Sequence, residues 1–375
     1  MKIIEYHCGN IDEIGWDYSK VKFDKINLLV GDTATGKSRF LNTIFNICRF
    51  VVSKEFRRGQ WDITFEQSRV IYTWNLQTGK DDSGNNIIKQ ELLYKHDGDR
   101  LIPIINRNDK EFIFNDKQIP KLSLEETSIS LLKEEELIKP LYEGFSIIKR
   151  RLFHTDALSK ASEFQSIPPA LITDMEKKRN LEKIFLTELP LSPTLYILQK
   201  FFNDIYELII EQYKQFFPFI RETRITDLSK INPNISLPGL FPVFSIKEAG
   251  LNKWINIDQM SSGMLKILLI LTDIFIIPEG GVYLIDEYEN SLGISAIDFF
   301  PKFILNLEKE VQFFITSHHP YIINEIPPKN WYIFHREGMR VSIMYGEEVS
   351  ERFGKSKQKA FIQLINDPFF ARKVQ

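Results

Sequence analysis

The chain has 375 residues, 43% of them hydrophobic and 13% aromatic, and its 48 Lys and Arg nearly balance its 50 Asp and Glu. This size allows one large domain or two closely associated ones, and the formal net charge of −2 excludes a polycation built throughout for nucleic acid. The two cysteines, Cys8 and Cys48, form no C-x-x-C pair, so neither a disulfide framework nor a structural zinc site is predicted.

Neither a signal peptide nor a membrane span is predicted. The N-terminal residues carry charges early and contain no long apolar run. The longest apolar stretch, ILLILTDIFIIP, is interrupted by Asp273 and ends at Pro278, which makes it too short and too polar for a bilayer. We therefore expect a cytoplasmic protein without a membrane partner.

A phosphate-binding loop follows the first apolar run. Residues 24–30, DKINLLV, predict a strand, and residues 31–38 have the pattern G-x-x-x-x-G-K-S before a helical pattern begins. In such a loop Gly36 lets backbone amides point at phosphate oxygens, Lys37 neutralises phosphate charge and Ser38 ligates Mg²⁺. The alternative is a plain glycine turn that caps the helix. The candidate nucleotide-binding residues are Gly31, Asp32, Thr33, Ala34, Thr35, Gly36, Lys37, Ser38 and Arg39.

The middle of the chain changes from a strand pattern to a helix pattern. Residues 61–118 alternate apolar and polar character, which predicts an antiparallel β section. Within it, KDDSGNN lacks the glutamate that closes a calcium loop and is interpreted as a hairpin tip. Residues 124–151 and 170–220 are predicted helices that form a lid. The basic clusters at 149–151 and 177–179 predict a solvated helix face, with a nucleic-acid contact as the alternative.

A second anion-binding candidate precedes a strongly apolar helical pattern. Ser261, Ser262 and Gly263 in the segment MSSGM come directly before MLKILLILTDIF. Backbone amides at a helix N-terminus bind anions, so these three residues are candidate nucleotide contacts. The alternative is a simple helix N-cap.

Two adjacent acids follow the next buried strand. Residues 282–285 are all apolar, and Asp286 and Glu287 stand at the carboxyl end of this strand, where parallel sheets bind ligands. Asp286 is suited to coordinating Mg²⁺ and Glu287 to polarising an attacking water. The alternative is a strand end with two solvated acids.

A histidine pair follows the last apolar run of this kind. The segment VQFFITSHHP predicts a buried strand with a polar cluster at its carboxyl end. A histidine there could contact a γ-phosphate, although a histidine is more often structural. The residues alone do not decide between His318 and His319.

The order of these motifs resembles that of ABC-type ATPases. MSSGM looks like the ABC signature with Ser261 and Gly263 retained, and TSHHP resembles the switch segment with His318 as the switch histidine. The long separation between the P-loop and the signature resembles SMC-like and OLD-like ATPases rather than transporter subunits. The segment LIDEYENSL resembles the small standalone ATPases of bacterial anti-phage defence systems.

The sequence departs from the family pattern at several positions. Thr33 stands where the P-loop commonly has Asn, Ser262 and Met264 replace signature residues, and Gly293 and Ile294 replace a His-Pro pair. None of these changes removes a catalytic group. The glutamine that usually links the nucleotide to the lid is not assigned.

The resemblance implies an α/β fold, with an ABC-ATPase-like P-loop core, a mixed sheet, an antiparallel β section and an inserted helical lid. The expected boundaries are 1–123 and 240–350 for the nucleotide-binding core and 124–239 for the lid. Residues 351–375 are expected to form a C-terminal helical tail.

The resemblance also implies a mechanism. Two copies would sandwich two ATP molecules with Mg²⁺, each P-loop facing the partner's signature, so a homo-oligomer is expected, either a dimer or a higher assembly of dimers. ATP would close the pair and hydrolysis would open it. In this mechanism Lys37 binds phosphate, and Ser38 and Asp286 bind Mg²⁺. Glu287 is the base, and His318 senses the γ-phosphate. Ser261 and Gly263 complete the partner's site.

Three functions follow from this interpretation. The first is an ATP-hydrolysing switch of a defence or genome-maintenance complex that controls a separate effector such as a nuclease. The alternative is a RecF-like or SMC-like clamp that binds DNA when ATP is bound, which salt-dependent DNA binding would favour. A scaffold with a degenerate site is disfavoured because every catalytic position is filled.

Overall fold

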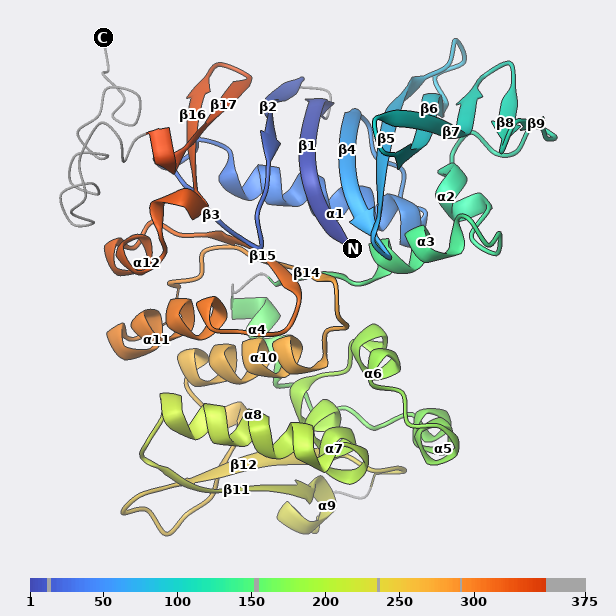
Figure 1. Cartoon of the computed structure of the whole chain (residues 1–375). Helices are drawn as coiled ribbons and strands as arrows, with labels where there is room; N and C mark the ends of the chain where they lie inside the picture. Colours follow the sequence, from blue (N-terminus) through green and yellow to red (C-terminus); the bar gives the residue numbers. More distant parts are fainter. Residues whose placement is uncertain (12–14, 152–154, 235–236, 291, 349–375) are drawn as a thin grey trace. The chain divides into compact units, whose positions relative to one another are not determined.

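The computed structural model of the chain consists of two compact units (Figure 1). Unit 1 contains residues 1–151, 279–288 and 305–375, and unit 2 contains residues 152–278 and 289–304. The chain thus crosses between the units after residues 151, 278, 288 and 304. The structure describes the whole chain except residues 12–14, 152–154, 235–236, 291 and 349–375, so the predicted C-terminal helical tail lies outside the described residues.

Unit 1 is built on a mixed sheet. Its 14 described strands lie in the order β10-β14-β15-β3-β16-β17-β2-β1-β4-β5-β6-β7-β8-β9. The strands from β10 to β16 pair in parallel, and every pair from β2 to β9 is antiparallel. Between these two parts, β17 pairs antiparallel with β16 and in parallel with β2. The predicted α/β fold with a mixed sheet is confirmed. The strands are β1 (Lys2–Ile11), β2 (Trp16–Lys22), β3 (Ile26–Val30), β4 (Gln60–Gln67), β5 (Val70–Lys80), β6 (Asn86–Asp97), β7 (Arg100–Asn108), β8 (Phe112–Phe114), β9 (Lys117–Gln118), β10 (Ile148–Arg151), β14 (Gly281–Ile285), β15 (Val311–Thr316), β16 (Trp331–Glu337) and β17 (Arg340–Tyr345).

Three adjacent parallel strands, β14, β15 and β3, are buried along their whole length. Their largely apolar sequences, in which Asn27, Gln312 and Thr316 are the polar residues, are typical of parallel strands that are covered on both faces. Because the three strands run parallel, their carboxyl ends lie at one edge of the sheet. This edge carries the P-loop after β3, the two acids after β14 and the histidine segment after β15.

The helices of unit 1 pack around an aromatic core. Phe40 on the first helix is fully buried, and its ring lies 5.5 Å from Tyr6, 5.2 Å from Tyr18 and 5.3 Å from Phe334. These contacts fix the helix that follows the P-loop against strands from distant parts of the sequence. The helices are α1 (Lys37–Ser53), α2 (Ser128–Leu131), α3 (Lys139–Ser146), α12 (Pro320–Glu325) and the 3₁₀ turn η2 (Pro328–Asn330).

The predicted antiparallel section is confirmed as β4 to β9. The segment KDDSGNN connects β5 to β6 as the predicted hairpin tip. The carboxylate of Asp81 accepts hydrogen bonds from the amides of Ser83 and Asn85, at 2.9 and 2.8 Å. These local bonds replace ladder bonds where the chain reverses.

A buried ion pair anchors the segment that leaves this section. Glu91 and Arg107 are both almost completely buried, and the Arg107 Nη1 to Glu91 Oε2 distance is 3.4 Å. The Glu91 carboxylate also accepts hydrogen bonds from the Trp74 indole and from the amide and hydroxyl of Ser128. Burial raises the pKa of Glu91, while Arg107 and Ser128 act in the opposite direction. The start of α2 is thereby tied to β6 and β7.

The prediction for residues 124–151 is partly wrong. Two short helices form there, but the basic cluster at 149–151 lies on strand β10 and not on a solvated helix face. Lys149 is only 4% exposed. The strand pairs in parallel with β14, and this long-range pairing outweighs the local helical pattern. The structure also assigns 124–151 to unit 1 and 240–278 to unit 2, which differs from the expected boundaries.

Unit 2 is mainly helical, in agreement with the helices predicted for 170–220. Its helix α10 is hydrophobic almost all round and buried along nearly its whole length. The helices are α4 (Thr155–Ala161), α5 (Pro169–Lys177), α6 (Leu181–Thr187), α7 (Leu191–Phe201), α8 (Asn203–Phe216), α9 (Leu228–Ile231), η1 (Ile257–Gln259), α10 (Ser262–Ile276) and α11 (Ile294–Leu305). A small antiparallel sheet consists of β11 (Ile220–Asp227), β12 (Pro242–Glu248) and β13 (Ile255–Asn256).

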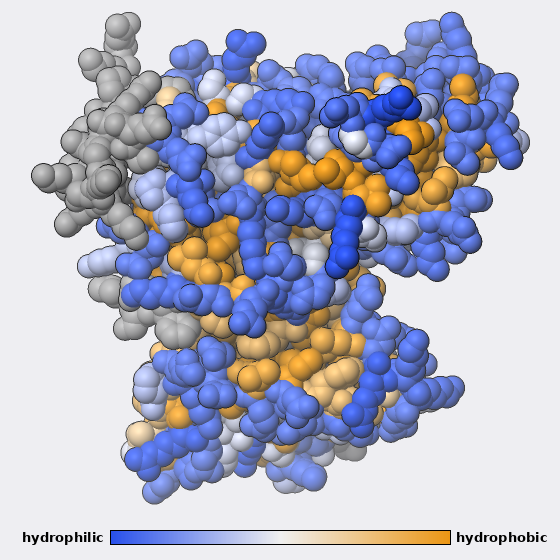
Figure 2. All heavy atoms as spheres, in the orientation of Figure 1, coloured by the Kyte–Doolittle hydropathy of each residue, from blue (hydrophilic) through white to orange (hydrophobic). Residues whose placement is uncertain are grey.

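No helix among the described residues is long and apolar enough to cross a membrane. Even α10, the most apolar helix, has only 15 residues, whereas about 20 are needed to cross a bilayer. Figure 2 shows hydrophilic residues over most of the visible face, with hydrophobic residues in smaller groups between them.

A partly buried charge cluster on unit 1 predicts pH-dependent stability. The His7 ring lies 3.0 Å from Asp62 and 3.4 Å from Asp17. The hydrogen bond between the His7 ring and the accepting Asp62 carboxylate raises the pKa of His7 against the effect of burial and lowers the pKa of Asp62. The raised His7 pKa stabilises the fold fully below about pH 6.5, the unfolded value, and this contribution is lost as the pH rises through the folded value.

We expect His7→Gln to lower the melting temperature more at pH 5.5 than at pH 8.5. The difference between the two pH values in the lost free energy of unfolding should be small, about 1 kcal/mol or less, because the pair is partly exposed. Thermal unfolding followed by circular dichroism at both pH values measures it. Asp62→Asn should remove the same pH-dependent contribution to stability, because both variants break the pair of His7 with Asp62. An equal loss at both pH values in His7→Gln would contradict this assignment.

Candidate functional site

The predicted phosphate loop connects β3 to α1. Gly36, the last residue of the loop, has a φ of 97°, in the left-handed region that favours glycine. A Cβ atom at this position would lie 3.1 Å from both the Trp16 ring and the Tyr18 hydroxyl. The Tyr18 hydroxyl also donates a hydrogen bond to the Gly36 carbonyl, at 3.2 Å. Two aromatic residues of β2 therefore lie against the loop at Gly36.

The ammonium group of Lys37 lies inside this loop. The residue is only 5% exposed, and its Nζ donates hydrogen bonds to the carbonyls of Gly31 and Asp32, each at 2.8 Å. Charge-assisted bonds to phosphate are stronger than bonds to neutral carbonyls. A bound triphosphate would therefore compete successfully for this ammonium group.

The two predicted magnesium ligands are adjacent although they are far apart in the sequence. Asp286 follows β14 directly, and its Oδ1 accepts a hydrogen bond from the Ser38 Oγ at 2.9 Å. The Thr316 hydroxyl donates to the same oxygen at 2.7 Å. Mg²⁺ prefers oxygen ligands and is usually held by one or two protein groups together with phosphates and water. Ser38 and Asp286 therefore fit a magnesium ion that arrives with a nucleotide.

The remaining oxygen of Asp286 faces a buried arginine that the sequence analysis did not select. The Arg150 Nη2 lies 3.4 Å from the Asp286 Oδ2, and the Arg150 side chain is only 11% exposed. Burial lowers the pKa of Arg150, and the neighbouring Asp286 opposes that shift. An arginine nevertheless stays protonated in a protein. The acid is thus balanced by a resident positive charge, which no local sequence signal could reveal because β10 and β14 are distant in the chain.

We expect Arg150→Met to lower the stability of the metal-free protein by about 3 kcal/mol, because it leaves the buried Asp286 without its cation. Millimolar Mg²⁺ should restore part of this loss, since the metal supplies the missing positive charge. Differential scanning calorimetry with EDTA or with Mg²⁺ measures both effects. Arg150→Lys retains the charge and should behave more like the wild type. An unchanged melting temperature of Arg150→Met in EDTA would contradict the assignment.

One cavity of about 290 Å³ brings the candidate groups of unit 1 together. The P-loop forms one wall, and Glu287 and the histidine segment form another. Glu287 is exposed to solvent, and its backbone has a φ of 50°, which is uncommon for a residue with a side chain. The lining residues are Trp16, Thr33, Ala34, Gly36, Lys37, Ser38, Arg39, Glu287, Thr316, His318 and Arg336.

The two histidines have different surroundings. His318 is exposed and lines the cavity beside the P-loop. His319 caps α12, where its ring accepts a hydrogen bond from the Tyr321 amide at 3.4 Å and stacks on the Tyr321 ring. The geometry favours His318 as the residue that meets the nucleotide, and its role as a γ-phosphate sensor stays a prediction.

An aromatic residue between two arginines forms a further wall of the cavity. The Arg336 guanidinium lies 4.2 Å from the Trp16 ring centre, and that of Arg39 lies 4.8 Å away. Arg336 also donates a hydrogen bond to the Ala34 carbonyl in the P-loop, at 3.2 Å. The sequence analysis did not select Trp16 or Arg336, because neither belongs to a linear motif. They add apolar surface and positive charge to the lining of the cavity.

The signature residues belong to unit 2. Ser261 is the N-cap of α10, and its side chain accepts a hydrogen bond from the Met264 amide at 3.3 Å. Gly263 lies in the first turn of the same helix. The buried Lys266 donates to the Asn290 carbonyl at 2.9 Å and so fixes this turn within unit 2. The N-cap alternative therefore describes Ser261 in this structure, while contact of the signature with a nucleotide stays a prediction.

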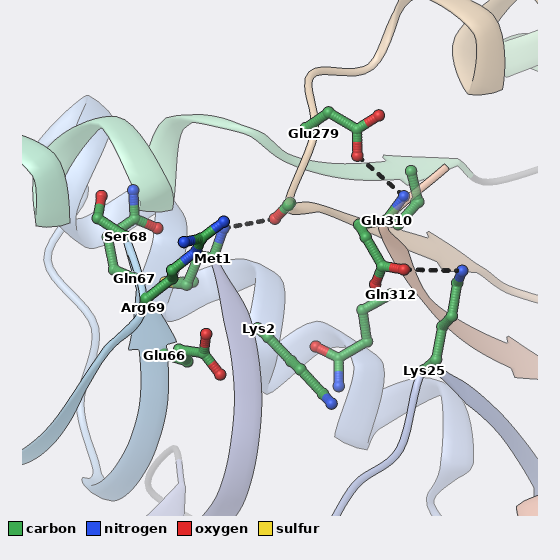
Figure 3. Close-up of a pocket in the computed structure, with 12 residues that line it drawn as sticks. Met1, Lys2, Lys25, Glu66, Gln67, Ser68, Arg69, Glu279, Glu310 and Gln312 are labelled. Atoms are coloured by element: carbon green, nitrogen blue, oxygen red, sulfur yellow. Dashed lines mark hydrogen bonds and ion pairs between the residues drawn. The ribbon is translucent and has the colours of Figure 1, made fainter. Parts of the chain in front are cut away.

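A larger cavity, of about 580 Å³, lies at the opposite edge of the sheet, at the amino ends of β14 and β15 (Figure 3). There the Met1 amino group donates to the Gly280 carbonyl, and Lys25 lies 3.4 Å from Glu310. Its lining mixes acidic and basic side chains, without a glycine loop or the paired acids. The smaller cavity therefore has the chemistry for a nucleotide, and the larger one does not.

Comparisons with known proteins agree with this geometry. Residues 26–324 match the family described as "AAA domain, putative AbiEii toxin, Type IV TA system". A search of curated proteins gave no match to the sequence. A solved SMC head bound to the C-terminal winged-helix domain of ScpA is 14% identical, with a TM-score of 0.56 over 92% of this chain and 97% of that one. An SMC head from Pyrococcus furiosus, with an extended coiled coil and bound to the C-terminal domain of ScpA, is 13% identical, with a TM-score of 0.51 over 98% and 100%.

The family match covers the P-loop, the acids and the histidine segment, and the structural likeness shows the fold of an SMC head. The chain therefore belongs to this AAA family, and its fold is that of an SMC head.

Proposed function

We propose that the chain binds ATP with Mg²⁺, hydrolyses it between two copies of itself, and thereby controls a separate effector of a bacterial defence or genome-maintenance system. The observation that supports hydrolysis is that Lys37, Ser38, Glu287 and His318 line one cavity. Asp286 is joined to this group by its hydrogen bond with Ser38. These groups supply phosphate binding, metal binding and a base, which together are what phosphoryl transfer to water requires.

Each group has a defined part in the proposed reaction. Lys37 binds the β- and γ-phosphates, and Ser38 and Asp286 hold Mg²⁺, which neutralises charge on the phosphates when bound. Glu287 accepts a proton from the attacking water. His318 contacts the γ-phosphate from the other wall of the cavity. In this assignment the residues orient the nucleotide and the water and do little covalent chemistry.

We further propose that Ser261 and Gly263 complete the site of the partner copy. A test uses two inactive variants, Lys37→Ala and Ser261→Arg. In a mixed pair one site combines both changes, whereas the other has an intact P-loop and an intact signature. If sites are shared between copies, mixing should restore about a quarter of the wild-type activity, because half of the random pairs are mixed and each has one working site. No recovery after confirmed subunit exchange would refute shared sites.

The proposed effector rests on two observations. The family description names a putative toxin of a toxin–antitoxin system, and both solved SMC heads are bound to a domain of a second protein. Purification of the tagged chain from its native host, followed by mass measurement with ATP and with ADP, tests this part. A partner that is bound or released according to the nucleotide supports it. Recovery of the chain with DNA and no protein partner would instead favour the clamp alternative.

A further inference from the structure

Thr316, the last residue of β15, contacts three consecutive residues after the neighbouring strand β14. Its hydroxyl donates a hydrogen bond to the Asp286 Oδ1 at 2.7 Å and accepts one from the Glu287 amide at 2.7 Å. Its backbone carbonyl accepts a third bond, from the Tyr288 amide, at 3.1 Å. Thr316 is 1% exposed, so these bonds are shielded from water. A single residue thus holds the whole turn that carries both acids.

The direction of these bonds is fixed by chemistry. A threonine hydroxyl has one proton and can also accept. The amide of Glu287 can only donate, so the hydroxyl must accept that bond and must give its own proton to Asp286. The Asp286 Oδ1 therefore accepts the bond from Thr316, and it accepts a second hydrogen bond from the Ser38 hydroxyl at 2.9 Å. The metal-binding acid is therefore kept in one orientation by donors from two elements.

The same hydroxyl stabilises an unfavourable backbone. Glu287 has a φ of 50°, whereas the residues of β14 before it are extended. A non-glycine residue in this region costs about 1–2 kcal/mol and persists only when its surroundings hold it there. The bonds that Thr316 accepts from the amides of Glu287 and Tyr288 supply that restraint. Without the hydroxyl, the Glu287 backbone could relax and carry its carboxylate away from the cavity.

We propose that Thr316 is a positioning residue. It fixes the orientation of Asp286, the metal-binding acid, relative to Glu287, the catalytic base. It acts through Asp286 and Glu287 and not through the nucleotide, so its loss should reduce the rate of hydrolysis far more than the binding of ATP. This inference rests on the proposed function, since it requires that the chain hydrolyse ATP and that Glu287 be the base.

The experiment compares Thr316→Val, which keeps the shape and removes the hydroxyl, with Thr316→Ser, which keeps the hydroxyl. Thr272→Val is the matched control, because Thr272 is also buried but its hydroxyl bonds to the Leu268 carbonyl of its own helix. We expect Thr316→Val to lower kcat about 100-fold, with the Kd for Mg·ATP changed by less than about threefold. Thr316→Ser and Thr272→Val should stay close to the wild type. Steady-state phosphate release and isothermal titration measure the two quantities.

A second pair of variants keeps the inference testable if Thr316→Val misfolds. If Thr316→Val does not fold, Thr316→Ala and Thr316→Ser are compared, because both lose the methyl group and only Ser retains the hydroxyl. Equal kcat values for Ala and Ser, a folded Thr316→Val with wild-type kcat, or a loss confined to the Kd would each overturn the inference. A wild-type protein that binds ATP without hydrolysing it would refute the proposed function itself, so the two failures are distinguishable.

Discussion

Glu287→Gln is expected to bind Mg·ATP and to hydrolyse it about 100 to 10,000 times more slowly than the wild type, the usual contribution of a positioned general base. Glutamine has the same shape but cannot accept the proton of the attacking water. Glu287 lines the cavity beside the P-loop. Lys37, Ser38 and Asp286, the proposed ligands of the phosphates and the metal, are unchanged in this variant. With hydrolysis blocked, ATP should stay bound and the closed pair of subunits should accumulate. Single-turnover phosphate release and mass photometry measure these effects.

The matched control for this variant is Glu279→Gln. Glu279 lies just before the same strand, but at the opposite edge of the sheet, where its carboxylate accepts a bond from the Glu310 amide. A glutamine oxygen can accept that bond equally well, so turnover should be unchanged. Wild-type turnover by Glu287→Gln would remove Glu287 from the role of base.

Lys37→Ala should weaken nucleotide binding by at least about 100-fold, which corresponds to about 3 kcal/mol. The substitution removes the only charged side chain that the loop directs at its own centre among the described residues 31–38. It also leaves the carbonyls of Gly31 and Asp32 without the ammonium that now binds them. Titration with a fluorescent ATP analogue measures the affinity.

Lys25→Ala provides the comparison for this second variant. The Lys25 ammonium also donates to a backbone carbonyl, that of Leu307 at 3.1 Å, but it lines the larger cavity at the other edge of the sheet. Its removal should leave nucleotide affinity unchanged. If both lysine variants bind the analogue as tightly as the wild type, the loop does not hold a triphosphate.

The P-loop and the acids could be predicted because their signals are local. β14 is an apolar run and β3 is apolar except for Asn27, and each is followed at once by the polar residues that it presents at the edge of the sheet. Burial on both faces requires such runs wherever parallel strands occur. The position of Ser38 beside Asp286 then follows from the parallel pairing of β3, β15 and β14, which the fold class already implies.

Arg150 and Thr316 could not be predicted, because their roles depend on which strands are neighbours. β10 has four residues, two of them arginines, and by itself it resembles the end of a charged helix. Only its pairing with β14 brings Arg150 to Asp286. A single threonine at the end of β15 carries no signal until the turn after β14 is placed beside it.

The boundary of the lid was misplaced for a related reason. Residues 128–146 form short helices, and helices were expected to belong to the inserted lid. In the structure they pack on unit 1, where Ile129, Leu141 and Phe145 join the hydrophobic core and the Cys48 thiol donates to the Phe145 carbonyl. Secondary structure alone does not reveal which core a helix covers, because that depends on apolar contacts with residues distant in sequence.

The order of strands in unit 1 has a consequence for synthesis on the ribosome. β3 ends at Val30, but both of its neighbours in the sheet, β15 and β16, begin only at Val311 and Trp331. A nascent chain must therefore keep this apolar strand unpaired until most of the protein has been translated, which makes folding slow and exposes it to aggregation. Truncated translation products that end before β15 should therefore bind chaperones. They should also lack enzymatic activity, because the strand that precedes the P-loop has no neighbours in the sheet.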